Sequence, residues 1–325
     1  MKHPTRRTVI QGSTAAVVAT SGLGAAWQAA AGGGVPKRAL QPLSTVLTTH
    51  DQHWVGDGFH VYTIFSPHRL DPRLLSPFIL MDYAPPLWFD SSSRPRGVGE
   101  HPHRGFETVT FALDGEIDHR DSNGGGGRIG RGDVQWMTAG AGVVHEEMHS
   151  KRLTNEGGLL EMVQLWVNLP ARLKMTPPRY QSLLAADFPR IEIRDASARV
   201  IAGEWGGVVG TARTHTPITI LDIELGAGGG TWLEPKPGTT TLAFVLRGRV
   251  MAQGRSDLGV RDLVVFDRAK PGRLEFEARA DTRLLVLNGE PFDEEVVARG
   301  PFVMNTEHEI AEAIRDYRSG KMGHL

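Results

Sequence analysis

The chain has no cysteine among its 325 residues. Disulfide bonds, zinc sites with thiolate ligands and a cysteine nucleophile are therefore excluded. Any metal would have to be held by histidine and carboxylate side chains. The fold would have to be stabilised by its hydrophobic core alone.

The sequence also lacks an excess of charge of either sign. It carries 36 basic and 37 acidic side chains, which gives a formal net charge of −1 at pH 7. So small a charge provides no general attraction to a phosphate backbone. We therefore expect no nucleic-acid partner.

Acidic residues are missing from the beginning of the chain, where none precedes Asp51. Lys2, Arg6 and Arg7 form a basic start, and residues 8–31 are small, uncharged and mildly apolar. A basic segment, an apolar segment and a small-residue end in this order are typical of a cleavable signal peptide.

The motif TRRTVI, which contains the arginine pair, resembles the twin-arginine export signal, although Gln11 stands where lysine is common. We predict a signal peptide over residues 1–31, a linker over residues 32–44 and a periplasmic location. Because residues 8–31 are only mildly apolar, we expect no stable membrane insertion after cleavage.

Glycine and proline are abundant, at 39 and 20 residues, which favours turns and short strands over long helices. Alternating or short apolar runs between turn residues predict strands at 59–65, 76–83, 106–121, 132–140, 159–170, 217–229, 239–250, 261–267 and 282–289. The pattern repeats weakly at about 130 residues, which predicts an all-β fold of two barrels in tandem. We place the first barrel at residues 45–170 and the second at residues 171–325.

One helix is predicted near the end of the chain. Thr306 and Glu309 form a capping box, apolar residues follow at helical spacing from Ile310 to Tyr317, and Gly320 would end the helix. We expect this helix to serve in packing.

The stretch HPHRGFETV, residues 101–109, contains two histidines at strand spacing. Residues two apart on a strand face the same side, so His101 and His103 can present two imidazoles to one cation. Later in the same half, HEEMH places His145 and Glu147 on a shared face. Three imidazoles and one carboxylate suit Fe(II), Mn, Co, Ni, Cu(II) or Zn. We predict one divalent-metal site in the first barrel.

Other side chains in this region leave alternatives open. Glu107 has the parity of the first histidine pair and is a further ligand candidate, or it could pair locally with Arg104. His119 and His149 could line the pocket or make ordinary hydrogen bonds. Beyond residue 170, histidine occurs only singly, which predicts no equivalent site in the second barrel: His215, His308 and His324.

Four motifs occur in the order found in the pirin family of the bicupin superfamily: HPHRGFETVTFALDGEIDHRDS, GDVQWMTAGAGVVHEEM, VQLWVNLPA and GPFVMNTEHEI. The resemblance runs from Asp51 to Gly323. It implies two cupin barrels of jelly-roll type with a short C-terminal helix, and metal in the N-terminal barrel. The implied ligands are His101, His103, His145 and Glu147.

In many other cupins the carboxylate ligand corresponds to Glu107. Following the pirin pattern, we expect Glu107 to support the ligands from behind. Two features depart from the family pattern: the leader, since the best-known pirins lie inside cells, and His149, where proline is common.

Several pirins resemble quercetin 2,3-dioxygenase in activity. The resemblance therefore implies a metal-dependent dioxygenase, with Fe(II) as the first choice of metal, that opens a flavonol or similar aromatic enol with O2. Glu147, once released from the metal, is the candidate catalytic base. The competing hypotheses are a metal-binding redox sensor or interaction protein without turnover, and a cupin isomerase or lyase. We expect a monomer.

Overall fold

The computed structural model describes residues 39–193, 195–254 and 256–325. The predicted signal peptide, residues 1–31, lies outside the described residues. Among the described residues, none of the helices has the length and apolarity that crossing a bilayer requires.

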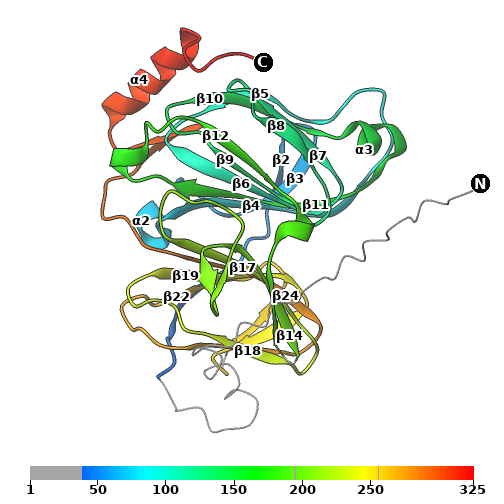
Figure 1. Ribbon diagram of the computed structural model, residues 1–325, viewed down its shortest axis with the longest axis vertical. Coiled ribbons are helices and arrows are strands. Elements are labelled where there is room, and N and C mark those ends of the chain that lie inside the picture. The colour runs from blue at the N-terminus through cyan, green and yellow to red at the C-terminus, as the bar shows by residue number, and fades with distance from the viewer. Residues whose placement is uncertain (1–38, 194, 255) are drawn as a thin grey trace, which may run out of the picture. The chain divides into compact units, whose positions relative to one another are not determined.

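The first barrel consists of two antiparallel sheets that face each other (Figure 1). The larger sheet has the order β12-β9-β6-β11-β4-β3-β2 and the smaller one the order β5-β10-β7-β8. The strands of the larger sheet are β2 (Gln52–Val55), β3 (Phe59–Phe65), β4 (Phe78–Phe89), β6 (Phe106–Asp114), β9 (Val134–Thr138), β11 (Gly158–Asn168) and β12 (Arg179–Leu183). Those of the smaller sheet are β5 (Gly97–His103), β7 (Ile117–Asp121), β8 (Gly126–Ile129) and β10 (Val143–His149).

The second barrel repeats this arrangement, with sheet orders β1-β22-β19-β24-β17-β14-β13 and β18-β23-β20-β21. Its larger sheet contains β1 (Leu43–Leu47), β13 (Arg190–Ile193), β14 (Ala196–Ala202), β17 (Ile218–Leu225), β19 (Thr240–Arg247), β22 (Leu263–Phe266) and β24 (Thr282–Gly289). Its smaller sheet contains β18 (Gly230–Leu233), β20 (Arg249–Ala252), β21 (Ser256–Gly259) and β23 (Leu274–Ala278). The predicted fold class, two cupin barrels and a C-terminal helix, is confirmed.

Short elements complete the described chain. Two small hairpins are formed by β15 (Glu204–Trp205) with β16 (Val208–Val209) and by β25 (Val297–Arg299) with β26 (Phe302–Met304). The α-helices are α2 (Pro72–Leu75), α3 (Lys151–Glu156) and α4 (Glu307–Arg318), and the 3-10 turns are η2 (Ala171–Leu173) and η3 (Ala185–Asp187).

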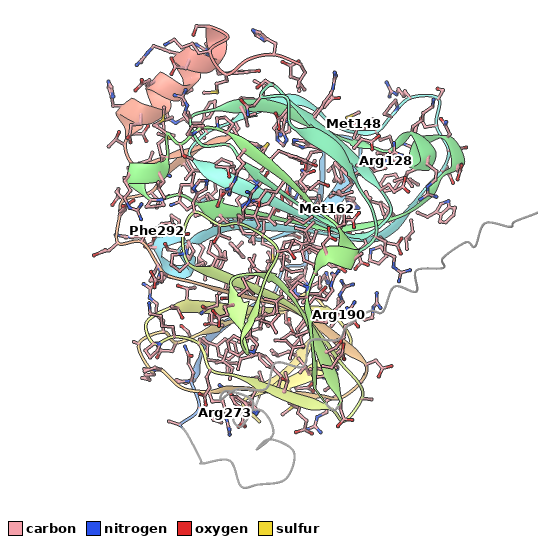
Figure 2. The ribbon with its side chains drawn as sticks, in the orientation of Figure 1. Arg128, Met148, Met162, Arg190, Arg273 and Phe292 are labelled. Atoms are coloured by element: carbon pink, nitrogen blue, oxygen red, sulfur yellow. The ribbon has the colours of Figure 1, made fainter. Side chains whose placement is uncertain are left out.

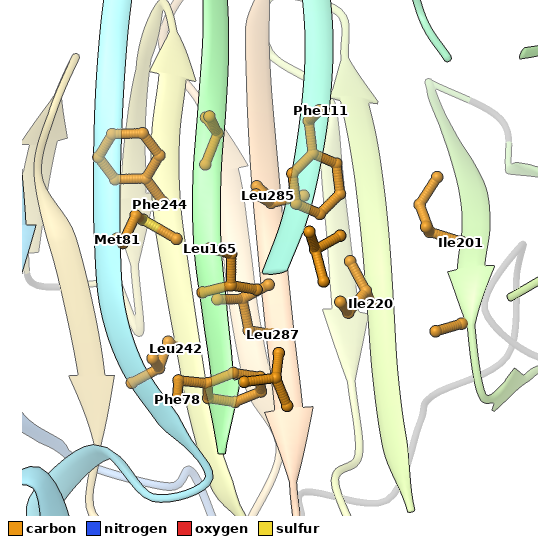
Figure 3. Packing of buried hydrophobic residues seen from close by; sticks show 14 of the residues in the cluster. Phe78, Met81, Phe111, Leu165, Ile201, Ile220, Leu242, Phe244, Leu285 and Leu287 are labelled. Carbon is orange, nitrogen blue, oxygen red and sulfur yellow. The ribbon is translucent and has the colours of Figure 1, made fainter. Parts of the chain in front are cut away.

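The two larger sheets pack face to face through one hydrophobic core (Figure 3). Phe78 and Met81 of β4 meet Leu242 and Phe244 of β19 in this cluster. A fully buried side chain of this size contributes about 1.5–3 kcal/mol. The shared core therefore holds the barrels as one structural unit.

The interiors of the two barrels differ in chemistry, although side chains fill both (Figure 2). The second barrel encloses a large apolar cluster that includes Val250 and Phe276. The first barrel has a smaller apolar cluster around Met162, and the rest of its interior holds histidines, amides and carboxylates. Among the described residues, clusters with metal-binding geometry occur in the first barrel.

Strand pairing crosses two of the predicted domain limits, the end of the linker and the boundary between the barrels. Strand β1 begins inside the predicted linker and pairs with β22 of the second barrel. Strand β12 lies beyond the predicted boundary at residue 170 but pairs with β9 of the first barrel. A chain that adds its strands to both barrels cannot be divided by one cut in the sequence.

Helix α4 lies against the first barrel although it ends the second half of the chain (Figure 1). Thr306 caps it by accepting a hydrogen bond from the Glu309 amide, as the capping box predicts. Its buried residues Ile310 and Ala313 pack against Val144 of β10. The helix therefore covers the sheet that carries the candidate metal ligands.

Candidate metal centre

The predicted imidazoles come together on two neighbouring strands. Strands β5 and β10 pair antiparallel, and His145 lies directly opposite His101. The possible ligand atoms of His101, His103 and His145 all lie within 4.8 Å of one another. The ring centroids of His101 and His145 are 4.3 Å apart, and that of His103 is 4.8 Å from each of them. The parity argument thus placed these three side chains correctly.

Backbone contacts fix two of the three rings. The Nδ1 atom of His101 lies 2.8 Å from the carbonyl oxygen of Gly99, and Nδ1 of His103 lies 3.2 Å from that of Pro301. A carbonyl oxygen accepts, so each Nδ1 carries the hydrogen and leaves the Nε2 lone pair free. Metal-binding histidines commonly have their other nitrogen held in this way.

Burial keeps two of the three imidazoles, His103 and His145, neutral. Burial, with the neighbouring His101, lowers the pKa of His103 to about 3. Burial and the surrounding histidines also lower the pKa of His145 well below its ordinary value. Neutral imidazole is the form that binds a metal. The Nε2 atom of His145 is buried and has no hydrogen-bond partner. Such an atom costs free energy unless a cation or donor occupies the space before it, so these residues fit a divalent metal.

Glu147 is buried beside this cluster but is held by other side chains. Its Oε1 accepts from Gln135 Nε2 at 2.7 Å and from the Thr110 hydroxyl at 3.0 Å, and its Oε2 accepts from Gln164 Nε2 at 3.0 Å. The possible ligand atoms of Glu147, His119 and His145 lie within 4.8 Å of one another. This second group shares only His145 with the imidazole trio. The role of Glu147 as fourth ligand therefore stays a prediction that requires its side chain to turn.

The histidines considered as pocket residues have different surroundings. His119 is buried and belongs to the second group, and its Nδ1 lies 3.4 Å from Nδ1 of His145. His149 has its Nε2 2.9 Å from the carbonyl oxygen of Gly58 and packs edge-on against Phe89. His149 therefore shares the parity of the ligands but belongs to neither metal-binding group.

The structure corrects the expectations for Glu107 and Arg104. Gly105 has φ +91°, and a Cβ there would lie 2.0 Å from the Val303 carbonyl oxygen, so this turn requires glycine. The turn ends β5 and restarts the alternation in β6. Glu107 consequently faces away from Thr110, which contacts Glu147, and accepts from the Thr138 hydroxyl instead.

Arg104 pairs with the C-terminal helix. Its guanidinium donates to Asp316 at 3.0 Å and to the carbonyl oxygen of Ala141 at 2.7 Å. The alternative of a local pair between Arg104 and Glu107 is therefore wrong. The residue next to a candidate ligand anchors α4.

Sequence reasoning missed several side chains that complete the site. Gln135 and Gln164 come from β9 and β11, and the Trp166 ring lies 5.2 Å from that of His103. Tyr180 of β12 stacks on His119 with the rings 4.8 Å apart. All four occupy alternate positions of strands in the larger sheet. That parity was the available signal, but it requires the strand pairing to be known.

Comparison with known proteins agrees with this fold. The sequence pattern of the pirin family matches residues 59–167, and that of the pirin C-terminal cupin domain matches residues 220–323. A Pseudomonas aeruginosa protein named as a candidate quercetin 2,3-dioxygenase is 51% identical over 273 residues, covering 83% of this chain and 94% of that protein. Pirin-1 of Arabidopsis thaliana is 40% identical over 262 residues, covering 78% and 86%.

A solved structure gives the same result. The crystal structure of a quercetin 2,3-dioxygenase from Acinetobacter baumannii matches with a TM-score of 0.84 at 48% identity, covering 88% of this chain and 99% of that one. Fold and buried cluster together define a bicupin protein with a candidate metal centre. The chain belongs to the pirin family.

Proposed function

We propose that this protein is a metal-dependent dioxygenase of the quercetin 2,3-dioxygenase type. The observation that carries the proposal is the trio of clustered imidazoles, two of them buried, with the unpartnered Nε2 of His145. The names of the Pseudomonas and Acinetobacter relatives support the same chemistry. We propose Fe(II) as the metal, with Mn, Co, Ni, Cu and Zn as the alternatives that this donor set also accepts. When bound, the metal supplies Lewis-acid activation of hydroxyl and carbonyl oxygens.

The substrate would be a flavonol or similar aromatic enol together with O2. Trp166 follows Gln164 at strand spacing, so both face the barrel interior where Gln164 meets Glu147. The centroid of the Trp166 ring lies 4.3 Å from that of Phe106 and 5.2 Å from that of His103. A partly exposed indole beside the ligands offers a flat surface for an aromatic substrate.

Glu147 is the proposed general base for the enol hydroxyl. Its carboxylate would take the proton after exchanging at least one of the hydrogen bonds that now hold it. The Thr110 hydroxyl is the weakest restraint, since it has one hydrogen and lies within bonding distance of both Glu147 and Gln164. The two glutamine amides would keep the rest of the carboxylate in place.

Oxygen consumption tests this function. Protein loaded anaerobically with each metal is mixed with quercetin, and O2 uptake is followed with the flavonol absorbance. We expect equimolar loss of O2 and flavonol with release of carbon monoxide, and none with His145→Ala. Quercetin binding without O2 uptake for every metal would reject the dioxygenase and favour a binding protein, or an isomerase or lyase.

We also propose that residues 1–31 direct export to the periplasm. The twin-arginine pattern of Arg6 and Arg7 supports this. A fusion of residues 1–44 to a reporter that works only after export should be active, and Arg6→Lys with Arg7→Lys should abolish its activity. An unchanged reporter signal in the double variant would reject the proposal.

A further inference from the structure

A chain of polar contacts runs from His145 away from the candidate metal position. Asp121 of β7 lies opposite His145 in the strand pairing, and His119 lies opposite Glu147. His119 Nδ1 is 3.4 Å from His145 Nδ1, and His119 Nε2 is 3.4 Å from Asp121 Oδ2. The order is therefore Asp121, His119, His145 and then the unpartnered Nε2.

The far end of this chain is fixed by backbone. Asp121 Oδ1 accepts from the amides of Asn123 and Gly125, both at 2.9 Å, in the glycine-rich turn after β7. The second oxygen, Oδ2, is left to face His119. Tyr180 stacks on His119 at an interplanar angle of 19°, which holds the plane of the imidazole. Neither the Asp121 carboxylate nor the His119 ring can therefore rotate without breaking these contacts.

One amide determines which ring nitrogens carry hydrogen. Gln135 Nε2 lies 2.7 Å from Glu147 Oε1, so the atom facing this carboxylate must be the amide donor. The same nitrogen lies 3.1 Å from His119 Nδ1, which must then accept. His119 consequently carries its hydrogen on Nε2 and donates it to Asp121. The remaining contact, 3.4 Å between the two Nδ1 atoms, is favourable only if His145 carries its hydrogen on Nδ1 and shares the one lone pair of His119 Nδ1 with Gln135.

We infer that His119 and Asp121 are positioning residues for the metal centre, acting through His145. They hold His145 in the tautomer whose Nε2 lone pair faces the cation, and the carboxylate at the end of the chain makes that nitrogen a stronger donor. This inference rests on the proposed metal centre and extends it. The structure thereby gives His119 a role other than that of a ligand, since both of its nitrogens are already engaged.

Asp121→Asn provides the test because it should reverse the direction of the hydrogen bonds that run from residue 121 through His119 to His145. The two backbone amides still require an acceptor, so the Asn123 and Gly125 contacts keep the amide oxygen, and the new NH2 group faces His119. His119 must then accept at Nε2 and carry its hydrogen on Nδ1, against the hydrogens of Gln135 and His145. Asp118→Asn is the matched control, because Asp118 lies on the same strand, is half-buried and pairs outward with Arg128.

The first measurement uses the metal-free full chain labelled with ¹⁵N-histidine, in which the imidazole nitrogen shifts report the tautomers. We expect hydrogen on Nε2 of His119 and on Nδ1 of His145 in the unchanged protein and in Asp118→Asn. In Asp121→Asn we expect His119 to change to the Nδ1 form. Hydrogen on Nε2 of His145 in the unchanged protein would overturn the inference, whether or not the variant folds.

The second measurement is Co(II) affinity and its ligand-field spectrum. We expect Asp121→Asn to bind Co(II) about 10–100-fold more weakly, with a shifted spectrum, and Asp118→Asn to match the unchanged protein. Equal affinity and spectrum in both variants would overturn the inference. These results do not depend on turnover. A protein that binds Co(II) as expected but never consumes O2 would contradict the proposed function and would still support this inference.

Discussion

The Nδ1 atom of His103 lies 3.2 Å from the carbonyl oxygen of Pro301, although the two residues are 198 positions apart in the sequence. Pro301 belongs to the turn between β25 and β26, after the second barrel is complete. The end of the chain thus returns to the first barrel and orients one of its candidate ligands. The buried amino group of Lys174 donates to Val303 O in the same hairpin.

Replacing Lys174 with methionine should loosen the β25–β26 hairpin from the turn at Gly105, which follows His103. Its Nζ donates to Gly105 O at 2.9 Å, Asn168 Oδ1 at 2.8 Å and Val303 O at 2.9 Å, all buried. Each acceptor left without a donor costs about 1–3 kcal/mol, so we expect a loss of at least about 3 kcal/mol in urea unfolding. Because the hairpin also holds His103, Co(II) affinity should fall about 10-fold.

The control for this change is Lys321→Met. Lys321 is exposed and pairs with Asp316, so its loss should change stability by less than about 1 kcal/mol. A Lys174→Met protein with an unchanged free energy of unfolding would show that the three hydrogen bonds contribute little to stability. Lower stability with full Co(II) affinity would show that the hairpin does not hold His103.

Removing an imidazole from the trio should remove the metal. We expect His145→Ala to weaken Co(II) binding by more than about 100-fold, beyond the usual cost of changes outside the ligands. His149→Ala is the matched control, since it lies on the same strand and face but contacts Gly58 and Phe89. Metal content by elemental analysis decides the comparison. Equal losses in both variants would point to a general effect on β10.

The stability of the protein should depend on pH through Glu107. Burial, opposed by the Thr138 hydrogen bond, raises the pKa of this carboxyl from 4.5 to about 7. Between these values the unfolded chain has released the proton and the folded chain still holds it. The contribution to stability is therefore present below pH 4.5 and falls as pH rises to 7, by about 3 kcal/mol over the window.

Glu107→Gln tests this dependence by urea unfolding at pH 5 and pH 8. The amide keeps an acceptor for the Thr138 hydroxyl and never ionises. We expect the variant to be the more stable protein at pH 8 and to differ little at pH 5. Parallel stability profiles for the two proteins would mean that Glu107 ionises normally in the folded state.

Trp166→Ala should weaken the binding of an aromatic substrate without removing the metal. The indole lies beside His103 and Phe106 but offers no ligand atom. Losing one aromatic face costs about 1 kcal/mol or more, so KM for quercetin should rise roughly 5- to 10-fold. Trp88→Ala serves as control because that side chain is 65% exposed. An unchanged KM at full metal content would remove Trp166 from the substrate surface.

The sequence alone was sufficient for the local features of this protein. Alternation and turn residues predicted β3, β4, β6, β9 and β11 of the first barrel and β17, β19, β22 and β24 of the second, and the capping box predicted α4. The spacing of His101 with His103 predicted one pair of imidazoles on a shared face. These features depend on neighbours in sequence or on the strand period of two. His145 was added from the second motif in the same half and from the resemblance to the pirin family.

Features that depend on pairing between distant segments could not be predicted. Nothing near Arg104 indicated Asp316, and nothing near His103 indicated Pro301. The parity of Glu107 failed because a glycine turn at Gly105 restarted the alternation. The assignment of β1 and β12 likewise followed from sheet edges that only the folded chain defines.

The metal centre can be examined in crystals of the protein grown with Co(II), with diffraction recorded on both sides of the cobalt absorption edge. We expect one strong anomalous peak at bonding distance from Nε2 of His101, His103 and His145, with Glu147 either turned toward the cobalt or still bound to Gln135 and Gln164. A cobalt peak elsewhere, or no peak at these three imidazoles, would show that they do not form a metal site.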